Sequence, residues 1–333
     1  MSSEQKKRLD GALELSLNYI LGRQRADGSW LDWDLPPGQS SIWTTAFVGY
    51  RLRNLPYHLR SRARESMRIA SDWLLERMFP DGGWGYTEQT GSDADSTAIA
   101  ILYLLSENQT VPDVSYLCLQ KFQCPDGGFS TYQQSGEVGS WGAAHGDVTP
   151  TAILALLTKY GSQAESVKRG IEYIIKKRTS NGVWESFWWT SFIYSTESTL
   201  ALINAIALDV DLRQTRETLL ATQFKTSFER ALLLASLVHL NPKLYHSTAW
   251  RLVDQLLQGQ EWNGSWKSDP SLRITRRDCF EPWKPGDPDT LFADTNRLFT
   301  TSTAIDALSR MYAVLESSSS REMWRQVRTR FWR

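Results

Sequence analysis

The chain has 333 residues, and its 37 Lys and Arg residues balance 37 Asp and Glu residues, so the formal net charge is zero. This balance offers no basic field to nucleic acid or to an anionic membrane surface. No apolar stretch reaches the roughly 18 residues of a membrane span, and the N-terminal segment lacks an apolar signal sequence. We therefore expect a cytoplasmic protein with no transmembrane segment and no nucleic-acid partner, and we leave a homodimer open.

Three cysteines, Cys118, Cys124 and Cys279, lack the spacing of a metal site, and their odd number argues against a disulfide framework. We expect no bound metal. The unusual count is tryptophan, with 15 residues. Any architecture for this chain has to place that aromatic excess.

A short turn, Asp-Gly or Asn-Gly followed closely by an aromatic residue, recurs along the chain. A degenerate copy without its glycine lies near residues 219–228. The turns divide the chain into about six units of about 55 residues, a period typical of repeat folds. We expect the turn aromatics to be structural residues that pack between helices. They are Trp30, Trp84, Phe129, Trp184 and Trp266.

Each unit has an amphipathic stretch before its turn, such as 62–78 or 163–178, and a more uniformly apolar stretch after it. The first pattern predicts a surface helix with one buried face, and the second predicts a helix that is buried all round. Six such pairs predict an all-α fold, a single (α/α)6 barrel over residues 1–333 with a pocket at one end of its inner ring. No alternating strand pattern occurs, and residues 320–333 predict one further amphipathic helix.

The segment GSDADSTAIAILYLL, residues 91–105, begins an inner helix with two acids, Asp93 and Asp95. Asp and Ser are preferred helix N-caps, so a cap explains one acid but not two. A helix N-terminus favours the carboxylate form, whereas burial and a second carboxylate raise one pKa of such a pair. One charged acid beside one protonated acid is therefore a hypothesis for this segment.

Residues 93–102, DADSTAIAIL, resemble the Asp-x-Asp-Asp-Thr-Ala motif of class II terpene cyclases, the squalene–hopene cyclase group. The Gly-aromatic turns resemble the QW repeats of that family, and the resemblance is collinear from about residue 62 to residue 210. It implies an enzyme that protonates an alkene or epoxide of an isoprenoid substrate and so starts carbocation cyclisation without a cofactor. By this resemblance Asp95 is the proton donor, and Asp93 is its charged or hydrogen-bonding neighbour.

The chain departs from the family pattern at two positions. Ser96 stands where the motif has its third acid, and Thr151 stands where a histidine that supports the acid is expected. His145 and Asp147 are candidates to replace that support, although His145 is equally explained as an ordinary loop histidine. Family members usually carry two helical domains, and this chain has room for one.

Aromatic side chains near the starts of the inner helices are candidates to line the pocket. Ring faces attract cations by about 2 kcal/mol or more where water is excluded, and they do not quench a carbocation as lone pairs do. Packing is the alternative, and for Trp188 and Trp189 the two readings are balanced. The candidate substrate-binding aromatics are Trp43, Trp141, Trp188, Trp189, Phe192, Tyr194, Phe228 and Phe299.

Residues 267–299 form a long loop at a place where the other units have a short one. Long loops in compact domains often cover or bind a substrate. Arginine suits a diphosphate, so the loop is a candidate site for the end of a prenyl diphosphate, with Mg²⁺ needed only in that case. The alternative is surface pairing with the acids of the same loop. The candidate arginines are Arg273, Arg276, Arg277 and Arg297.

Three other functions stay open. A protein prenyltransferase-like subunit shares the barrel but needs a zinc site, which the adjacent Asp278 and Cys279 do not supply with the expected spacing. A glycan-processing α/α barrel would stack sugars on the aromatics and use the two Asp residues as acid and base. A non-catalytic isoprenoid-binding scaffold is compatible with the missing third acid.

Overall fold

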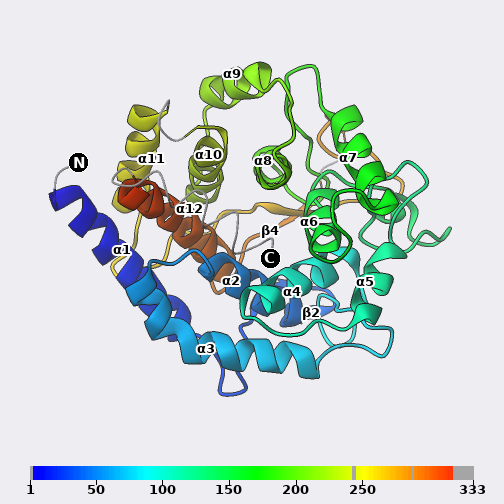
Figure 1. The fold of residues 1–333 in the computed structure, drawn as a ribbon, viewed down its shortest axis with the longest axis horizontal. Coiled ribbons are helices and arrows are strands. Elements are labelled where there is room, and N and C mark those ends of the chain that lie inside the picture. The colour runs from blue at the N-terminus through cyan, green and yellow to red at the C-terminus, as the bar shows by residue number, and fades with distance from the viewer. Residues whose placement is uncertain (1–2, 242–244, 287–288, 318–333) are drawn as a thin grey trace.

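The structure is a computed structural model that describes residues 3–241, 245–286 and 289–317. Its twelve described α-helices alternate along the chain between an outer and an inner ring (Figure 1). Each inner helix contacts the next one, and the last contacts the first, so the inner ring is closed. The inner helices are α2 (Ile42–Leu52), α4 (Ala94–Ser106), α6 (Thr149–Tyr160), α8 (Ile193–Ile206), α10 (Ser227–Leu240) and α12 (Leu298–Ser317). The outer helices are α1 (Ser3–Leu21), α3 (Tyr57–Glu76), α5 (Asp113–Gln120), α7 (Glu165–Lys177), α9 (Arg213–Ala221) and α11 (His246–Gln258).

This ring confirms the predicted (α/α)6 barrel, to which the structure adds four short strands that the sequence did not predict. Strand β1 (Asp32–Leu35) pairs with β2 (Gly38–Ser40) before α2, and β3 (Leu272–Ile274) pairs with β4 (Thr290–Phe292) before α12. These strands are too short to show an alternating pattern. The helix predicted for residues 320–333 lies outside the described residues. Within those that are described, no helix has the length and apolarity to cross a membrane.

The turns that carry a tryptophan are held by the same two hydrogen bonds. The indole N–H of Trp84 donates to the Leu74 carbonyl at 2.8 Å, which ties the turn to the end of α3. The backbone N–H of Trp84 donates to the Thr97 hydroxyl at 3.0 Å, which ties the same turn to α4. Trp30, Trp184 and Trp266 make both bonds in their own units, and Phe129 makes the backbone bond. The turn aromatics are thus buried structural residues, as the repeat predicts.

The glycine of each turn allows the turn to pack closely on the next outer helix. Gly82 and Gly264 have φ values of +88° and +90°, in the left-handed region that favours glycine. A Cβ atom on Gly82 would lie 2.8 Å from the Val114 carbonyl oxygen of α5, and one on Gly264 would lie 2.3 Å from the Leu15 carbonyl oxygen of α1. Because the turn of Gly264 follows α11, its contact with α1 closes the outer ring as well.

Candidate active site

Asp93 is the N-cap of α4. Its Oδ1 accepts the Ser96 backbone N–H, and its Oδ2 accepts the Ser96 hydroxyl, each at 2.7 Å. Burial raises the pKa of Asp93 to about 6, although the hydrogen bonds from Ser96 oppose this rise. Asp93 therefore supplies the N-cap of α4, and both the backbone N–H and the hydroxyl of Ser96 are engaged with Asp93.

Asp95 lies in the first turn of α4 and is not needed as a cap. Its Oδ2 accepts a hydrogen bond from the indole N–H of Trp43 on α2 at 2.8 Å, and its Oδ1 accepts none from the described residues. Burial and the charge of Asp93 raise the pKa of Asp95 to about 8, Asp147 adds to this rise, and the Trp43 N–H lowers it. The Asp95 carboxyl group is therefore largely protonated at neutral pH.

Asp95 lines two neighbouring cavities inside the barrel. The first, which we call the mouth cavity, has a volume of about 570 Å³ including its opening and lies at the N-terminal ends of the inner helices. The second, the inner cavity, has a volume of about 500 Å³ and extends along α2, α4, α6, α8 and α12. The mouth cavity is lined by Trp33, Leu35, Trp43, Tyr86, Asp93, Asp95, Ser96, Thr131, Tyr132, Trp188, Trp189, Leu272 and Ile274.

Aromatic rings form a continuous stack beside the mouth cavity. Trp189 stacks on Phe299 with a centroid distance of 4.5 Å, and Trp43 stacks on Phe299 at 5.6 Å. Phe228 packs against Phe299 at 4.9 Å, and neither of these two candidates lines the mouth cavity or the inner cavity, contrary to the sequence-based expectation. Tyr194 lines the inner cavity. Of the candidate aromatics, Trp43, Trp188 and Trp189 are the ones that line the mouth cavity.

Trp141 and Phe192 line neither cavity, contrary to the sequence-based expectation. Trp141 lies in the 3-10 turn η1 (Gly139–Gly142) and donates its indole N–H to the Thr275 carbonyl at 3.1 Å. Phe192 packs edge-on against Phe224 with a centroid distance of 5.8 Å. Both are packing residues.

His145 and Asp147 do not replace the family histidine beside Asp95. The His145 ring lines neither cavity and stacks on Phe187 at a centroid distance of 3.9 Å. Burial lowers the pKa of His145 to about 3, so the ring is neutral and offers no positive charge. Asp147 accepts the backbone N–H of Trp188 at 2.7 Å and so positions the loop before α8. The hydrogen-bond donor to Asp95 is instead Trp43.

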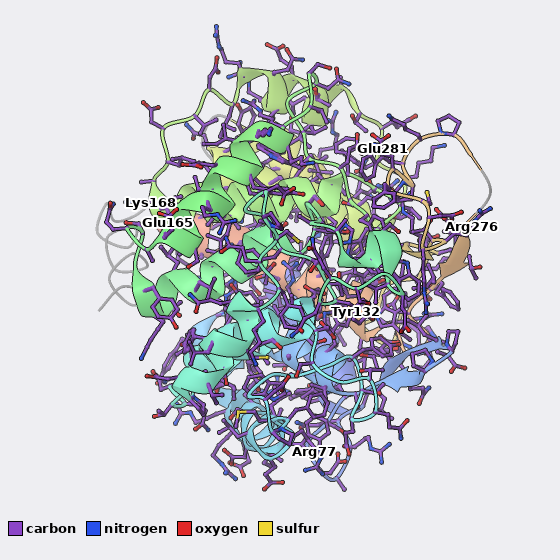
Figure 2. All side chains as sticks on the ribbon, turned by 90° about the vertical axis from the view of Figure 1, so that its right-hand side faces the viewer. Arg77, Tyr132, Glu165, Lys168, Arg276 and Glu281 are labelled. Carbon is purple, nitrogen blue, oxygen red and sulfur yellow. The ribbon has the colours of Figure 1, made fainter. Side chains whose placement is uncertain are left out.

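The arginines of the 267–299 loop anchor the loop and do not line the cavity. The Arg273 guanidinium donates to the carbonyls of Ser186 and Trp189 and lies 3.8 Å from the Asp289 carboxylate. Figure 2 shows Arg276 at the right-hand edge of the molecule, separated from Tyr132 near the middle of this face. The other three arginines are also engaged: Arg276 pairs with Asp278, Arg277 donates to the Glu137 carbonyl and covers the Trp141 ring, and Arg297 donates to the Ser265 hydroxyl.

The loop reaches the mouth cavity through apolar side chains, Leu272 and Ile274. An isolated backbone bridge between Leu272 and Trp189 seats strand β3 against the loop before α8. The loop therefore contributes hydrocarbon groups, and not charge, to the wall of the mouth cavity.

Several polar residues that line the mouth cavity were not among the sequence-based candidates. Tyr86 and Tyr132 follow the turn aromatics of two successive units, so a comparison of those units is a signal that would have found them. The Tyr86 hydroxyl and the indole N–H of Trp33 are buried and have no hydrogen-bond partner among the described residues. The Thr131 hydroxyl accepts the indole N–H of Trp188 at 2.7 Å. Among the residues that the structure describes, no group of three or more His, Cys, Asp or Glu side chains could hold a metal ion.

Comparison with known proteins identifies relatives of this chain. Residues 142–224 match the family described as Squalene-hopene cyclase C-terminal domain. A squalene-hopene cyclase of Schizosaccharomyces japonicus is 27% identical over 203 residues, which are 50% of this chain and 31% of that enzyme. A copalyl diphosphate synthase of Streptomyces cyslabdanicus is 31% identical over 100 residues, which are 29% of this chain and 17% of that enzyme. The matched part of the chain thus spans well under two thirds of these relatives.

A variant of the type II terpene cyclase MstE from Scytonema, in complex with geranylgeranyl dihydroxybenzoate, has a similar structure. The TM-score is 0.81 at 22% identity, and the match covers 94% of this chain and 99% of that chain. The likeness shows a shared fold. The family match and the curated relatives support the superfamily of class II terpene cyclases that includes the squalene–hopene cyclases, and the shared fold agrees with this.

Proposed function

We propose that the chain is a class II terpene cyclase in which Asp95 protonates a carbon–carbon double bond or an epoxide of an isoprenoid substrate. The observation that carries this proposal is a carboxyl group kept protonated by burial and by Asp93 at the wall of an aromatic cavity. The Asp95 O–H bond breaks, the substrate gains the proton, and the next double bond of the chain attacks the resulting carbocation. Loss of a proton from the last carbocation balances the reaction, which needs no cofactor.

The aromatic stack supports this chemistry. Trp43, Trp188 and Trp189 line the mouth cavity, and aromatic rings attract a cation without forming a bond to it. The Asp95 oxygen that accepts no hydrogen bond, Oδ1, is the one we assign to carry the transferable proton.

Trp43 supports Asp95 in place of the histidine that the family pattern expects at position 151, where this chain has Thr151. Asp95 becomes a carboxylate when its proton leaves, and hydrogen bonds to charged groups contribute about 1.5–3 kcal/mol. The Trp43 N–H, 2.8 Å from Oδ2, is in place to stabilise that carboxylate. Trp43 is therefore a positioning and acid-strengthening residue as well as part of the cavity wall.

The glycan-processing alternative needs two working carboxyl groups. Both oxygens of Asp93 are occupied by Ser96, so Asp93 is committed to capping α4. This arrangement favours a single-acid reaction over an acid–base pair. A non-catalytic scaffold is distinguished by turnover alone, because it would bind isoprenoids and leave them unchanged.

In this proposal a single barrel catalyses the whole cyclisation. It is supported by the 99% coverage of a solved terpene cyclase chain that holds geranylgeranyl dihydroxybenzoate. The direct test is incubation of the purified protein with prenyl alcohols, prenyl diphosphates, squalene and prenylated aromatics, followed by mass spectrometry. A cyclised product of unchanged mass, or of the mass of a hydrate, is the expected result.

Turnover should fall as the pH rises through about 8. Asp95 must carry its proton to donate it, and the protonated fraction falls about tenfold for each pH unit above the pKa. The measurement is kcat at saturating substrate from about pH 6 to about pH 10. Enzyme returned from high pH to neutral pH controls for unfolding. A rate that stays constant over the whole range would contradict the assignment of Asp95 as the acid.

Trp43→Phe should lower turnover by roughly 10- to 100-fold, because the stacked ring is kept but the hydrogen bond to the carboxylate is lost. The same loss raises the pKa of Asp95, so the fall in rate should move to higher pH. Trp189→Phe is the matched control, since it shortens a ring of the same stack without removing a bond to Asp95. An unshifted pH profile in Trp43→Phe would show that the bond has no influence on the acid.

A further inference from the structure

The ionisable groups that line the mouth cavity are all acidic. The charged or acidic groups among its lining residues are Asp93 and Asp95, and no Lys, Arg or His is among them. A diphosphate carries several negative charges, and burying a charge without an opposite partner is strongly unfavourable. Its charges would also face a carboxyl pair whose pKa values are already raised by burial. The wall therefore offers no compensation for a diphosphate.

Arg273, which neighbours the lining residues Leu272 and Ile274 in the sequence, is held in place by other groups. It is buried, and its two terminal nitrogens donate to the carbonyls of Ser186, Trp189 and Pro282, while its Nε has no partner among the described residues. If Arg273 moved to bind a substrate, those carbonyl groups would lose their donor. The 267–299 loop would then be detached from the loop before α8. The remaining loop arginines are engaged with Asp278, the Glu137 carbonyl and the Ser265 hydroxyl, as described above.

Cations also line the inner cavity, where two of the three arginines are paired with a buried carboxylate. Arg51 and Arg310 approach the Asp306 carboxylate at 2.9 Å and 3.1 Å. Arg53 lies over the ring of Tyr50 with its guanidinium 3.5 Å from the ring centroid. A phosphate placed there would have to compete with a buried carboxylate that accepts from two arginines.

The mouth cavity does contain uncharged donors without partners. The indole N–H of Trp33 is a donor only, and the Tyr86 hydroxyl can donate or accept. Each is buried on a residue that lines the cavity, and neither has a hydrogen-bond partner in the described part of the chain. A buried donor left unpaired costs about 1–3 kcal/mol, so a substrate oxygen that accepts from it would be recognised. Neutral donors of this kind suit an uncharged oxygen such as a hydroxyl, an ether or a carbonyl.

We propose that the substrate of the mouth cavity is an isoprenoid whose head is an uncharged oxygen group, and not a prenyl diphosphate. This inference rests on the proposed cyclase function and adds the class of substrate to it. The hydrocarbon chain lies along Trp43, Trp188 and Trp189, and the uncharged head accepts from Tyr86 or Trp33.

The test compares substrates that have the same hydrocarbon chain and differ only in the head group. Farnesol and farnesyl diphosphate, then geranylgeraniol and geranylgeranyl diphosphate, are offered to the full chain with and without Mg²⁺. Product is measured by mass spectrometry, and Kd by quenching of tryptophan fluorescence. We expect the alcohols to exceed the diphosphates by about tenfold or more in kcat/KM and in affinity, which corresponds to about 1.4 kcal/mol. Asp95-dependent cyclisation of the diphosphates at equal or higher efficiency would overturn this inference and leave the cyclase function intact.

Absence of turnover with every substrate would instead count against the cyclase function, and the Kd values would still decide the preference for the head. Ile274→Lys places a cation on the cavity wall and should raise diphosphate affinity by about tenfold, whereas the matched Ile274→Gln should not. Leu35→Lys and Leu35→Gln repeat the comparison at a second lining position in case the first pair is unstable. Tyr86→Phe should weaken binding of farnesol but not of the hydrocarbon farnesene. Diphosphate binding that Arg53→Gln abolishes would also overturn the proposal, because it would place the diphosphate in the inner cavity.

Discussion

Asp95→Asn is expected to reduce turnover by at least roughly 10²- to 10⁴-fold, to or near the limit of detection, while substrate affinity changes little. Asn keeps the size of the side chain, and its amide oxygen can still accept the Trp43 indole N–H. It has no proton acidic enough to transfer to an alkene. Product formation by mass spectrometry and Kd by tryptophan fluorescence measure the two quantities separately.

Asp34→Asn is the matched control for this substitution. Asp34 is an exposed carboxyl group on β1, close in sequence to the lining residues Trp33 and Leu35, and it does not line the cavity. It should retain turnover. Asp95→Asn at near wild-type rate, with an unchanged circular dichroism spectrum, would show that Asp95 is only a residue of the helix terminus.

Asp95→Asn should also have a higher free energy of unfolding than the wild type at pH 8, and this difference should shrink towards pH 4. Between the unfolded pKa of about 3.9 and the folded pKa of about 8, folded Asp95 keeps a proton that the unfolded chain releases. Wild-type stability therefore falls as the pH rises through this window, and Asn does not titrate. Each unit of pKa shift corresponds to about 1.4 kcal/mol, so a gain of a few kcal/mol is expected in urea unfolding. No gain at pH 8 would contradict a buried neutral acid.

Asp306→Asn should destabilise the fold by about 3–5 kcal/mol, because it breaks a buried ion-pair network in the barrel. Asp306 on α12 is fully buried and accepts from Arg51 on α2, from Arg310 and from Asn54. Burial raises the pKa of Asp306, but the charges of Arg310, Arg53 and Arg51 outweigh it and hold this pKa far below its usual range. Removing its charge leaves Arg310 and Arg51, both largely buried, without this carboxylate, and Arg51 keeps only Glu197 as an acidic partner among the described residues. The free energy of unfolding in urea measures the loss.

Asp254→Asn is the control for an exposed ion pair. Asp254 lies 3.3 Å from Arg8, and both side chains are about half exposed, so the substitution should cost no more than about 1 kcal/mol. If Asp306→Asn cost no more than this control, the network would contribute nothing to stability. The network also joins α8 and α10, since Glu197 contacts Arg51 at 3.7 Å and His239 at 3.3 Å.

The architecture was predictable because its signals are local and repeated. Each turn glycine, each turn aromatic and the Thr that starts the following inner helix recur in the sequence, and the same hydrogen bonds recur in the structure, as at Trp84 and Thr97. The short strands were not predictable, since β3 and β4 have three residues each and pair across a long loop.

The roles within the site were predictable only in part. The position of two acids before an apolar helix was visible, but which acid caps the helix depends on the hydrogen bonds of Ser96 to Asp93. The partner of Asp95 was not visible, because Trp43 comes from another helix, 52 residues away. His145 lay close to the expected place in the sequence, yet its ring faces Phe187.

The sequence by itself determined the six-unit barrel, the buried inner helices and the segment that begins with Asp93 and Asp95, because helix periodicity and turn chemistry act over a few residues. Only the tertiary structure decided which side chains meet at the cavity and which cations are left to bind a substrate. Arg273 illustrates the reason, since its carbonyl partners Ser186 and Trp189 lie 87 and 84 residues away in the chain. A side chain's charge can be read from the sequence, but its availability depends on neighbours that folding brings together.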